Sequence, residues 1–532
     1  MTDWVMTVVD SVSIQPYIFG SNNLKHIVGA SQLVYEATHD WVHGCLVDVG
    51  KTNVDRRGEF NDQRIEEPTH GLTSELVYAG GGNAVAIFKA IEDAQQFTRR
   101  LTEKALMDAP GLQIVVVHQP FAWGDNLAAV RRAAFQTLDR KKRDRRVSSP
   151  LLGLGVTADC QFTGLSAVTV QTEGDAQTED ATQAGRTDSW RISAEIRGKR
   201  SAFSDAHARL GKSLPSGYDF AADFDDFGDK GESSYIAIIH TDGNGMGKRI
   251  ETLEAGIRTT DFRAYIQAMR QFSASIQTAA ETAMDETIKL LIGNIDAEDK
   301  IGGIVTVRDK KKLPFRPIVF GGDDTTFVCD GRLALTLAEA YLRRLTTPTL
   351  SDNRPLTARA GVAVVNSHYP FARAYGLAEE LAGSVKQRIK KAERDMTAMD
   401  WHFAVSGLVL DLDAIRRREY TVAAGNLVMR PVALDGDSDW RTWDVFTHMM
   451  DGFRGTDWVG RRNKLKALRE ALRGGTERVK EFTQATVALP EIDGRPEARN
   501  DGWIGRCCVY YDAVEALDFY VPLKGPATGG AT

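Results

Sequence analysis

The same order of expected strands and helices occurs twice along the chain, and this repetition constrains its fold more than any other feature. The first copy reads as strand, helix, strand, tight turn, strand, helix, strand, with its turn at Gly80-Gly81-Gly82-Asn83. Apolar residues at strand or helix spacing carry these expectations. The ranges are 5–9, 22–47, 75–78, 84–88, 91–107 and 112–118, followed by a helix at 126–142. This is the element order of a ferredoxin-like domain.

The second copy follows the same order around Gly321-Gly322-Asp323-Asp324. The glycine turn takes the same topological place in both copies while the residue identities differ, so the repeat is one of element order. We therefore predict an α+β fold with two ferredoxin-like (βαββαβ) domains. The strands of the second copy are expected at 235–240, 318–320, 325–329 and 357–364, and its helices at 261–291, 333–345 and 372–393.

Two further regions complete the expected organisation. Residues 171–188 contain no large apolar side chain and are typical of a mobile loop. Residues 440–453 and 462–473 are helix-like, and the final GPATGGAT is expected to be a disordered tail. The predicted domains are a first ferredoxin-like domain at 1–150, a linker region at 151–232, a second ferredoxin-like domain at 233–415 and a mostly helical C-terminal domain at 416–532.

Composition excludes several classes of protein. Of the 532 residues, 42% are hydrophobic and 26% are charged, which suits folded cores and excludes wholesale disorder. The net charge of −6 restricts any nucleic-acid site to a local patch. No apolar run approaches the roughly 18–20 residues that cross a bilayer, and no basic leader precedes an apolar stretch at the N-terminus. The five cysteines form neither a disulfide framework nor a CxxC pair, so we expect a cytoplasmic protein without a membrane partner.

Three carboxylates form the sharpest candidate site. Asp242 closes the strand in IIHTDGNGMGK, and Asp323 and Asp324 form the tip of the hairpin in FGGDDTTF. In a ferredoxin-like sheet the first strand and the central hairpin are neighbours, so these side chains can converge although 81 residues separate Asp242 from Asp323. Grouped acids repel one another unless a cation lies between them, and Mg²⁺ or Mn²⁺ prefers such oxygen ligands. Two such ions about 3.5–4 Å apart can activate an attacking hydroxyl and stabilise a leaving pyrophosphate.

Glycines around these acids fit a phosphate site. Gly243, Gly245 and Gly247 remove side chains where a triphosphate would approach the backbone, and a helix that begins at Met246 directs free N–H groups towards phosphate. Taken singly, an Asp-Gly pair is most often a turn, and GGDD could be a surface hairpin. Their joint occurrence at two strand ends in the right order favours the catalytic interpretation. The remaining phosphate candidates are Gly321, Gly322, Lys248 and Lys386.

These motifs resemble the CRISPR polymerase family, the large subunit of type III CRISPR effector complexes. The resemblance runs from about residue 5 to about residue 435. It implies two palm domains, of which the second is an active nucleotide cyclase that joins ATP into 3′–5′ cyclic oligoadenylates, with release of pyrophosphate, in antiviral defence. The segments that carry it are YIFGSNNLKHIVGASQLVYEAT, YAGGGNAVAIF, YIAIIHTDGNGMGKRI, FGGDD, ARAGVAVVNSHYPFARAYGLAEELAGSVK and MDWHF.

The resemblance also implies roles for individual residues. Asp242 matches the metal ligand of the family's first strand, and Asp323 and Asp324 match the two catalytic acids of its GGDD signature. The first palm carries GGGN instead and is expected to be catalytically silent, because Asn83 is neutral, while still lining a second nucleotide pocket. Two Mg²⁺ or Mn²⁺ ions are assigned to Asp242, Gly243, Asp323 and Asp324. ATP binding is assigned to Gly243, Asn244, Gly245, Met246, Gly247, Lys248, Gly321, Gly322, Lys386, Gly81, Gly82 and Asn83.

The chain departs from the family's pattern in three places. The first palm begins almost at residue 1, so no N-terminal histidine–aspartate nuclease domain is expected, and the His39-Asp40 dipeptide is interpreted as a solvated helix face. Where relatives carry a zinc knuckle, this chain keeps only Cys160, so we predict no structural zinc there and a buried thiol. The basic run at 140–146 could contact RNA, or could be a solvated helix end favoured by the helix dipole.

Other functions stay open at this point. The chain could be mainly a scaffold or RNA-binding subunit of a guide-RNA ribonucleoprotein with little turnover, or a free-standing cyclase, as a homodimer, that makes another cyclic oligonucleotide. A diguanylate-cyclase-like activity is disfavoured because the motif is GGDD and not GGDEF. The expected partners are ATP and, within a type III complex, guide RNA, target RNA and other effector subunits. Base preference, ring size and the activating signal are not readable from one sequence.

Overall fold

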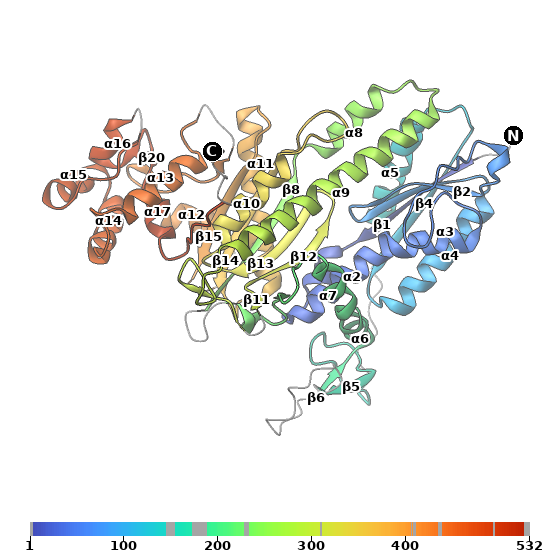
Figure 1. Ribbon diagram of the computed structural model, residues 1–532, viewed down its shortest axis with the longest axis horizontal. Helices are drawn as coiled ribbons and strands as arrows, with labels where there is room; N and C mark the ends of the chain where they lie inside the picture. Colours follow the sequence, from blue (N-terminus) through green and yellow to red (C-terminus); the bar gives the residue numbers. More distant parts are fainter. Residues whose placement is uncertain are drawn as a thin grey trace.

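The computed structural model describes residues 4–144, 155–172, 189–227, 234–308, 311–405, 407, 411–434, 439–492 and 495–525. Figure 1 shows two sheets side by side, a small hairpin that projects from their junction, and a group of helices at the C-terminal end. Most of the loop expected at 171–188 and of the expected tail lies outside the described residues. Within the described residues, no helix is both long and apolar enough to span a bilayer.

The first sheet has the strand order β2-β3-β1-β4 of a ferredoxin-like domain. Along β1, Val5 and Val9 enter one hydrophobic cluster and Met6 and Val8 enter another, because successive side chains point to opposite faces. Both faces are therefore covered by helices. The elements are β1 (Trp4–Val12), α1 (Ile14–Phe19), α2 (Leu24–Thr38), α3 (Asp40–Val49), a 3₁₀ turn (Pro68–His70), β2 (Ser74–Gly80), β3 (Asn83–Phe88), α4 (Ile91–Asp108), β4 (Gln113–Phe121) and α5 (Leu127–Asp144).

The second sheet repeats this topology and extends it. Its order is β12-β13-β8-β14-β15-β18, and the first four strands correspond to β2, β3, β1 and β4. The prediction of two βαββαβ units in an α+β chain is thus confirmed. The elements are β8 (Tyr235–Gly243), α8 (Met246–Ala255), α9 (Phe262–Gly293), β12 (Phe315–Gly321), β13 (Asp324–Asp330), α10 (Ala334–Thr346), β14 (Ala358–Asn366), α11 (Phe371–Ala392), β15 (Ala398–Ala404) and β18 (Val432–Ala433).

The long helix α9 joins the two units. Its buried Tyr265 and Met269 belong to a hydrophobic cluster of the first sheet, while the rest of α9 packs on the second (Figure 1). Near its start, Arg263 and Arg270 donate to the fully buried carboxylate of Glu75 on β2, at 2.7 and 3.1 Å. Apolar packing and these charge-assisted hydrogen bonds hold α9 against the first sheet.

The linker region packs against the first unit. Gly29 of α2 allows this, because a Cβ there would lie 1.7 Å from the carbonyl oxygen of Lys199 on α6. Cys160 is buried with Ile192 and Ile196, so the expected buried thiol is confirmed. The linker elements are β5 (Thr169–Thr172), β6 (Ser189–Ile192), α6 (Ala194–Ser201), α7 (Phe203–Gly211), β7 (Asp219–Phe220) and a 3₁₀ turn (Phe224–Asp226).

The C-terminal region is mostly helical, as expected, yet it is not cleanly separate from the second unit. Its strand β18 pairs with β15, and one hydrophobic cluster spans both regions. The proposed division at residue 415 stays a prediction. The elements are α12 (Leu412–Glu419), α13 (Trp443–Arg454), α14 (Arg462–Gly474), α15 (Thr476–Ala485), α16 (Pro496–Asp501), α17 (Tyr511–Ala516), β16 (Thr421–Val422), β17 (Gly425–Asn426), β19 (Trp503–Ile504) and β20 (Cys507–Cys508). Short strands β9 (Lys300–Ile301), β10 (Val305–Thr306) and β11 (Lys312–Leu313) lie between α9 and β12.

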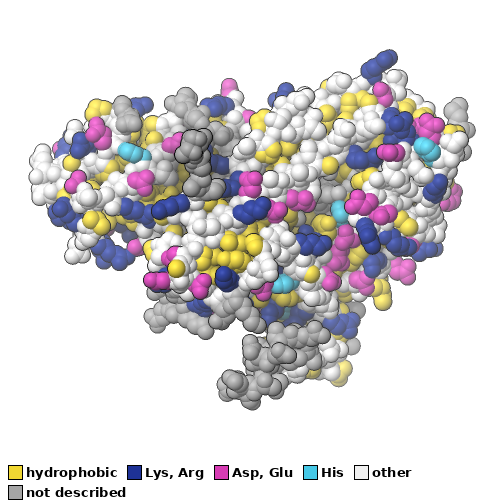
Figure 2. Space-filling model, viewed as in Figure 1, with side chains coloured by type: hydrophobic (Ala, Val, Ile, Leu, Met, Phe, Trp, Pro, Cys, Tyr) yellow, Lys and Arg dark blue, Asp and Glu magenta, His cyan; other side chains and the backbone are white. Residues whose placement is uncertain are grey.

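Charged side chains are mixed over the surface. On the face drawn in Figure 2, the described Lys and Arg side chains lie interspersed with Asp and Glu over both palm units and the C-terminal helices. A nucleic-acid site on this face would therefore have to be local, as the net charge of −6 indicates.

Candidate active site

The structure brings the three candidate acids together. Asp242 lies near the end of β8, Asp324 begins β13, and Asp323 lies in the turn between β12 and β13. Strand β13 pairs with β8, so the turn lies beside the end of β8. The backbone N–H of Gly243 donates to the carbonyl of Asp323 at 3.1 Å, which ties the two motifs to each other.

Glycines shape this site for reasons that differ from position to position. A Cβ on Gly243 would lie 2.7 Å from the Cβ of Asp323, so the space expected for a triphosphate is needed by the Asp323 side chain. Gly245 and Gly322 have φ values of +64° and +69°, which only glycine adopts readily. Gly247 and Gly321 have open space where a side chain would be, as expected of a phosphate site.

The carboxylates are electrostatically crowded. Burial, followed by the charge of Asp242, raises the pKa of Asp323 to about 6 and the pKa of Asp324 to about 7. About half of the Asp324 side chain is exposed, and it lines the cavity between the two units, so solvent screens part of this effect. Asp242 pairs with Arg359, which lies opposite it on β14. One guanidinium leaves two acids uncompensated, so this donor set fits divalent cations.

Asp323 and Asp324 face the first unit across a cavity of about 150 Å³. The two glycine turns lie against each other, since a Cβ on Gly322 would be 3.4 Å from the Cα of Gly81. Ligand sites in proteins usually measure roughly 300–1,000 Å³, so a nucleotide needs the turns to move apart. The lining includes Ile14, Tyr35, Thr38, His39, Gly80, Gly81, Gly82, Gly321, Asp323 and Asp324.

Sequence reasoning missed that the first unit keeps an acid at the corresponding strand position. Asp10 lies opposite Asn83, and the N–H of the next residue, Ser11, donates to the carbonyl of Gly82, as Gly243 does to Asp323. Asp10 pairs with Lys142 of α5 at 2.5 Å. The sequence did not mark Asp10 as a candidate, because no glycine follows it and its partner Lys142 lies 132 residues away.

This pair also bears on the basic run at 140–146. The ammonium of Lys142 is directed at Asp10, and Lys141 donates to the carbonyl of Val116 at 3.1 Å. These two residues therefore make contacts within the first unit, and an RNA contact of the basic run stays a prediction. Residues 145 and 146 lie outside the described chain.

The predicted nucleotide contacts are in different environments. Asn83 has a buried Oδ1 without a hydrogen-bond partner in the described structure. The side chain of Asn244 is already engaged, because it donates to the carbonyl of Met396 and accepts from Arg359, both at 3.0 Å. Lys248 and Lys386 are exposed on α8 and α11.

Gln277 of α9 is a further residue that sequence reasoning missed. Its Oε1 accepts from the N–H of Gly322 at 3.0 Å and so holds the GGDD turn. No local motif marks this glutamine, because the contact joins a helix to a turn 45 residues away.

Comparison with known proteins agrees with this architecture. Residues 235–398 match the family model described as Cas10/Cmr2, second palm domain, which confirms the resemblance inferred from the motifs. No match was found among curated proteins.

Solved structures share the fold along nearly the whole chain. A Csm1-Csm4 cassette in complex with pppApApA matches with a TM-score of 0.52 and 12% identity, over 97% of this chain and 69% of that one. A Csm1-Csm4 cassette in complex with one ATP matches with a TM-score of 0.51 and 13% identity, over 98% and 70%. At such identities the likeness shows the fold alone.

Proposed function

We propose that this chain, whose residues 235–398 match the Cas10/Cmr2 second palm domain, is a metal-dependent nucleotidyltransferase that converts ATP into 3′–5′ cyclic oligoadenylates and releases pyrophosphate. The observation that carries the proposal is the convergence of Asp242, Asp323 and Asp324 at the end of β8, facing the glycine turn of the first unit across the cavity. The site would act in prokaryotic antiviral defence of the type III CRISPR kind.

The residues present fit two Mg²⁺ or Mn²⁺ ions. Burial, followed by the charge of Asp242, raises the pKa of Asp323 and of Asp324, and Asp242 is balanced by Arg359. Gly243 offers a carbonyl oxygen, which lies 3.4 Å from Nη1 of Arg359. When bound, such ions lower the pKa of the attacking 3′-hydroxyl and offset charge that builds on the reacting phosphate. The carboxylates would hold the ions, so no side-chain general base is required.

The start of α8 is the proposed triphosphate site. The helix begins at Met246, directly after the strand that carries Asp242, so its first N–H groups lie near the acids. Free N–H groups and the positive end of the helix dipole attract phosphate. Lys248 lies in the first turn and adds positive charge. Gly247 leaves the approach to this turn free of a side chain.

A second ATP would be held by the first unit. Ring closure needs two triphosphates that face each other, and the glycine turns of both units line one cavity. The buried Oδ1 of Asn83 lacks a donor in the described structure, so it can accept a hydrogen bond from a ligand amino or hydroxyl group. The first unit would not hold metal, because its turn has Gly82 and Asn83 in place of the two acids, and Lys142 pairs with the remaining Asp10.

The fold likeness also suggests partners. The matched chains are Csm1 in complexes with Csm4, one of them from a type III-A CRISPR-Csm interference complex. We accordingly propose that this chain binds other type III effector subunits, guide RNA and target RNA. The scaffold role and the enzymatic role are compatible within such a complex.

The decisive experiment is product analysis. Purified protein is incubated with each of the four NTPs and Mg²⁺ or Mn²⁺, and the products are resolved by mass spectrometry. We expect a cyclic oligoadenylate from ATP that the Asp323→Asn/Asp324→Asn variant does not make. If the free protein is inactive, the assay is repeated with the co-purifying RNA–protein fraction of the host. Absence of product there as well would reject the cyclase in favour of the scaffold.

A further inference from the structure

The break between α2 and α3 brings two histidines and an aspartate together outside the proposed catalytic site. A single helix was expected over 22–47, but His39 leaves helical geometry, with φ −130° and ψ −80°, and Asp40 begins α3. His39 and Asp40 are partly exposed, with side chains 27% and 49% exposed, as a solvated helix face requires, and the buried His43 lies beside them. Each of the three residues offers one ligand atom, and these atoms lie within 4.8 Å of one another.

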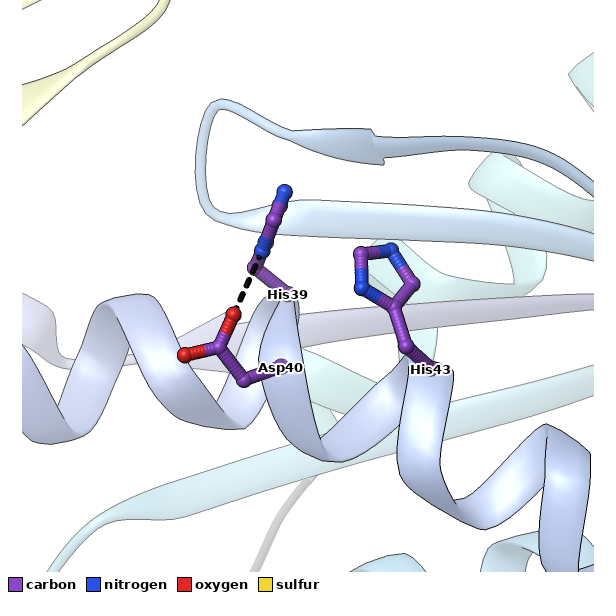
Figure 3. Close-up of side chains that lie close together, drawn as sticks. All are labelled: His39, Asp40 and His43. Carbon is purple, nitrogen blue, oxygen red and sulfur yellow. Dashed lines mark hydrogen bonds and ion pairs between the residues drawn. The ribbon is translucent and has the colours of Figure 1, made fainter. Parts of the chain in front are cut away.

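The side chains face a common space. Figure 3 shows a ring nitrogen of His43 directed towards His39 and Asp40, which are themselves linked by a 2.8 Å contact from Nδ1 to Oδ1. The Nδ1 of His43 is buried, with the residue only 2% exposed, and has no hydrogen-bond partner in the described structure. A buried polar atom without a partner is destabilising, and most such atoms in proteins are hydrogen-bonded or bound to an ion or water.

The backbone packs closely beside the two imidazoles. Gly58, with φ +89°, passes beside both rings, and a Cβ on it would lie 3.0 Å from Nδ1 of His43 and 3.7 Å from Cε1 of His39. A larger residue at this position would therefore crowd the cluster. Asp40 supplies a carboxylate next to the two rings, and carboxylate and imidazole together are ligands of Zn²⁺.

We propose that His39, Asp40 and His43 bind a divalent first-row transition-metal ion, with Zn²⁺ as its representative. Imidazole nitrogen suits Zn²⁺, whereas Mg²⁺ prefers oxygen ligands, so this site and the acidic site select different metals. Ligand atoms around a tetrahedral zinc lie roughly 3.4 Å apart, so the atoms, now within 4.8 Å of one another, must move closer together when the ion binds. Three protein ligands leave a fourth position for water or another ligand.

The position of the site gives the ion a structural consequence. His39 also lines the cavity between the units, together with Tyr35, Thr38 and the acids Asp323 and Asp324. An ion held by His39 and His43 would fasten the end of α2 to α3 and so fix one wall of that cavity. None of its ligands belongs to the acidic triad, so metal binding at this site can be measured in a protein that lacks Asp323 and Asp324.

Aromatic packing is the alternative explanation of this cluster. Tyr35 stacks on His39 with ring centroids 4.8 Å apart, and His39 meets His43 edge-on at 4.4 Å. Packing alone accounts for the proximity of the rings, but it leaves Nδ1 of His43 without a partner. The two explanations differ in whether the cluster has affinity for a metal.

The test is a calorimetric Zn²⁺ titration of the Asp323→Asn/Asp324→Asn protein with excess Mg²⁺ present, so that the acidic site does not contribute. We expect a single saturable site that raises the thermal midpoint. His39→Ala or Asp40→Asn should each weaken binding at least about 10-fold. The matched control His368→Ala, which removes an exposed histidine of the second unit, should bind as before. Co²⁺ at the same site should show the visible absorption of a tetrahedral ion.

Two results would overturn the site. One is the lack of saturable Zn²⁺ binding, and the other is affinity that is equal in the His39→Ala, Asp40→Asn and His368→Ala proteins. The decisive variants are at the more exposed ligands, whose side chains are 27% and 49% exposed, because replacement of the buried His43 can unfold the helix pair. Circular dichroism of each variant confirms that the fold persists.

Discussion

Lys142 and Asp10 form a 2.5 Å ion pair in the first palm unit, at the strand position where the second unit carries Asp242. In the second unit, Arg359 lies opposite the acid on the fourth strand of the repeat; in the first unit that place is taken by Val115. The cation instead comes from α5. In both units a basic side chain of the chain itself pairs with this acid, so the units differ in the turn, where Gly82 and Asn83 of the first unit take the places of Asp323 and Asp324.

Loss of this lysine should destabilise the protein without affecting product formation. Lys142→Met would leave Asp10, whose side chain is only 17% exposed, without its partner. We expect the free energy of unfolding to fall by about 1–3 kcal/mol. This is less than the 3–5 kcal/mol that follows when one partner of a fully buried pair is removed. Thermal unfolding measures the loss, and the double variant Asp10→Asn/Lys142→Met should recover most of it. Loss of cyclic product at unchanged stability would instead indicate a substrate contact for Lys142.

Gly243→Ala should abolish most activity although it changes no charged group. The added Cβ would lie 2.7 Å from that of Asp323 and would push the acids apart. A displacement of about 1 Å at a reacting centre can cost on the order of 100-fold in rate. The matched control is Gly376→Ala on α11, where an added Cβ meets nothing within 4 Å. Equal product yields from both variants, by mass spectrometry, would refute the steric role of Gly243.

The acidic site should make metal-free stability depend on pH. The folded-state pKa values of Asp323 and Asp324, about 6 and 7, lie above the roughly 3.9 of an unfolded aspartate. The folded state thus binds these protons more tightly, and stability falls as pH rises from about 4 through 7. In EDTA, the thermal midpoint of the wild type should drop between pH 5 and pH 8 by more than that of Asp323→Asn/Asp324→Asn. Mg²⁺ should restore it at pH 8.

An exposed aspartate provides the control for this pH effect. Asp62→Asn removes a carboxylate from the surface of the first unit, so the wild-type pH profile should persist. Identical pH profiles for the wild type and the double variant would show that the acids are not electrostatically crowded in solution.

Glu75→Gln should loosen the attachment of α9 to the first sheet. The buried carboxylate accepts from Arg263 and Arg270, and a neutral amide would leave both guanidiniums short of charge compensation. We expect the free energy of unfolding to fall by roughly 2–4 kcal/mol. The effect is limited because Arg263 keeps its second partner, Glu66. A lower thermal midpoint and faster limited proteolysis of the variant would show this destabilisation. The exposed Glu67→Gln should behave as wild type, and an unaltered melting curve for Glu75→Gln would contradict this role.

The fold and the acidic triad were predictable because their signals are local. Alternating apolar residues mark the strands, and Asp242 and the GGDD turn stand at strand ends within short motifs. Ferredoxin-like topology then makes β8 and the β12–β13 hairpin neighbours, and this brought the acids together as expected. Their catalytic and metal-binding roles stay predictions.

The partners of these motifs were not predictable. Lys142 contacts Asp10 of β1 from 132 residues away, and Gln277 contacts a turn 45 residues away, and no short motif records such a contact. His43 was overlooked because a continuous helix was expected at His39, and its burial depends on the loop that carries Gly58. Side-chain pairing across long sequence separations depends on how complete elements pack.

The sequence by itself determined the two βαββαβ units and the position of Asp242, Asp323 and Asp324 at strand ends, because strand spacing and glycine turns are properties of neighbouring residues. Only the tertiary structure decided which cation each acid meets. Asp10 meets Lys142, and Asp242 meets Arg359, because these pairs depend on register and helix packing. The same holds for the contact between the two glycine turns, since it arises from the packing of one unit against the other.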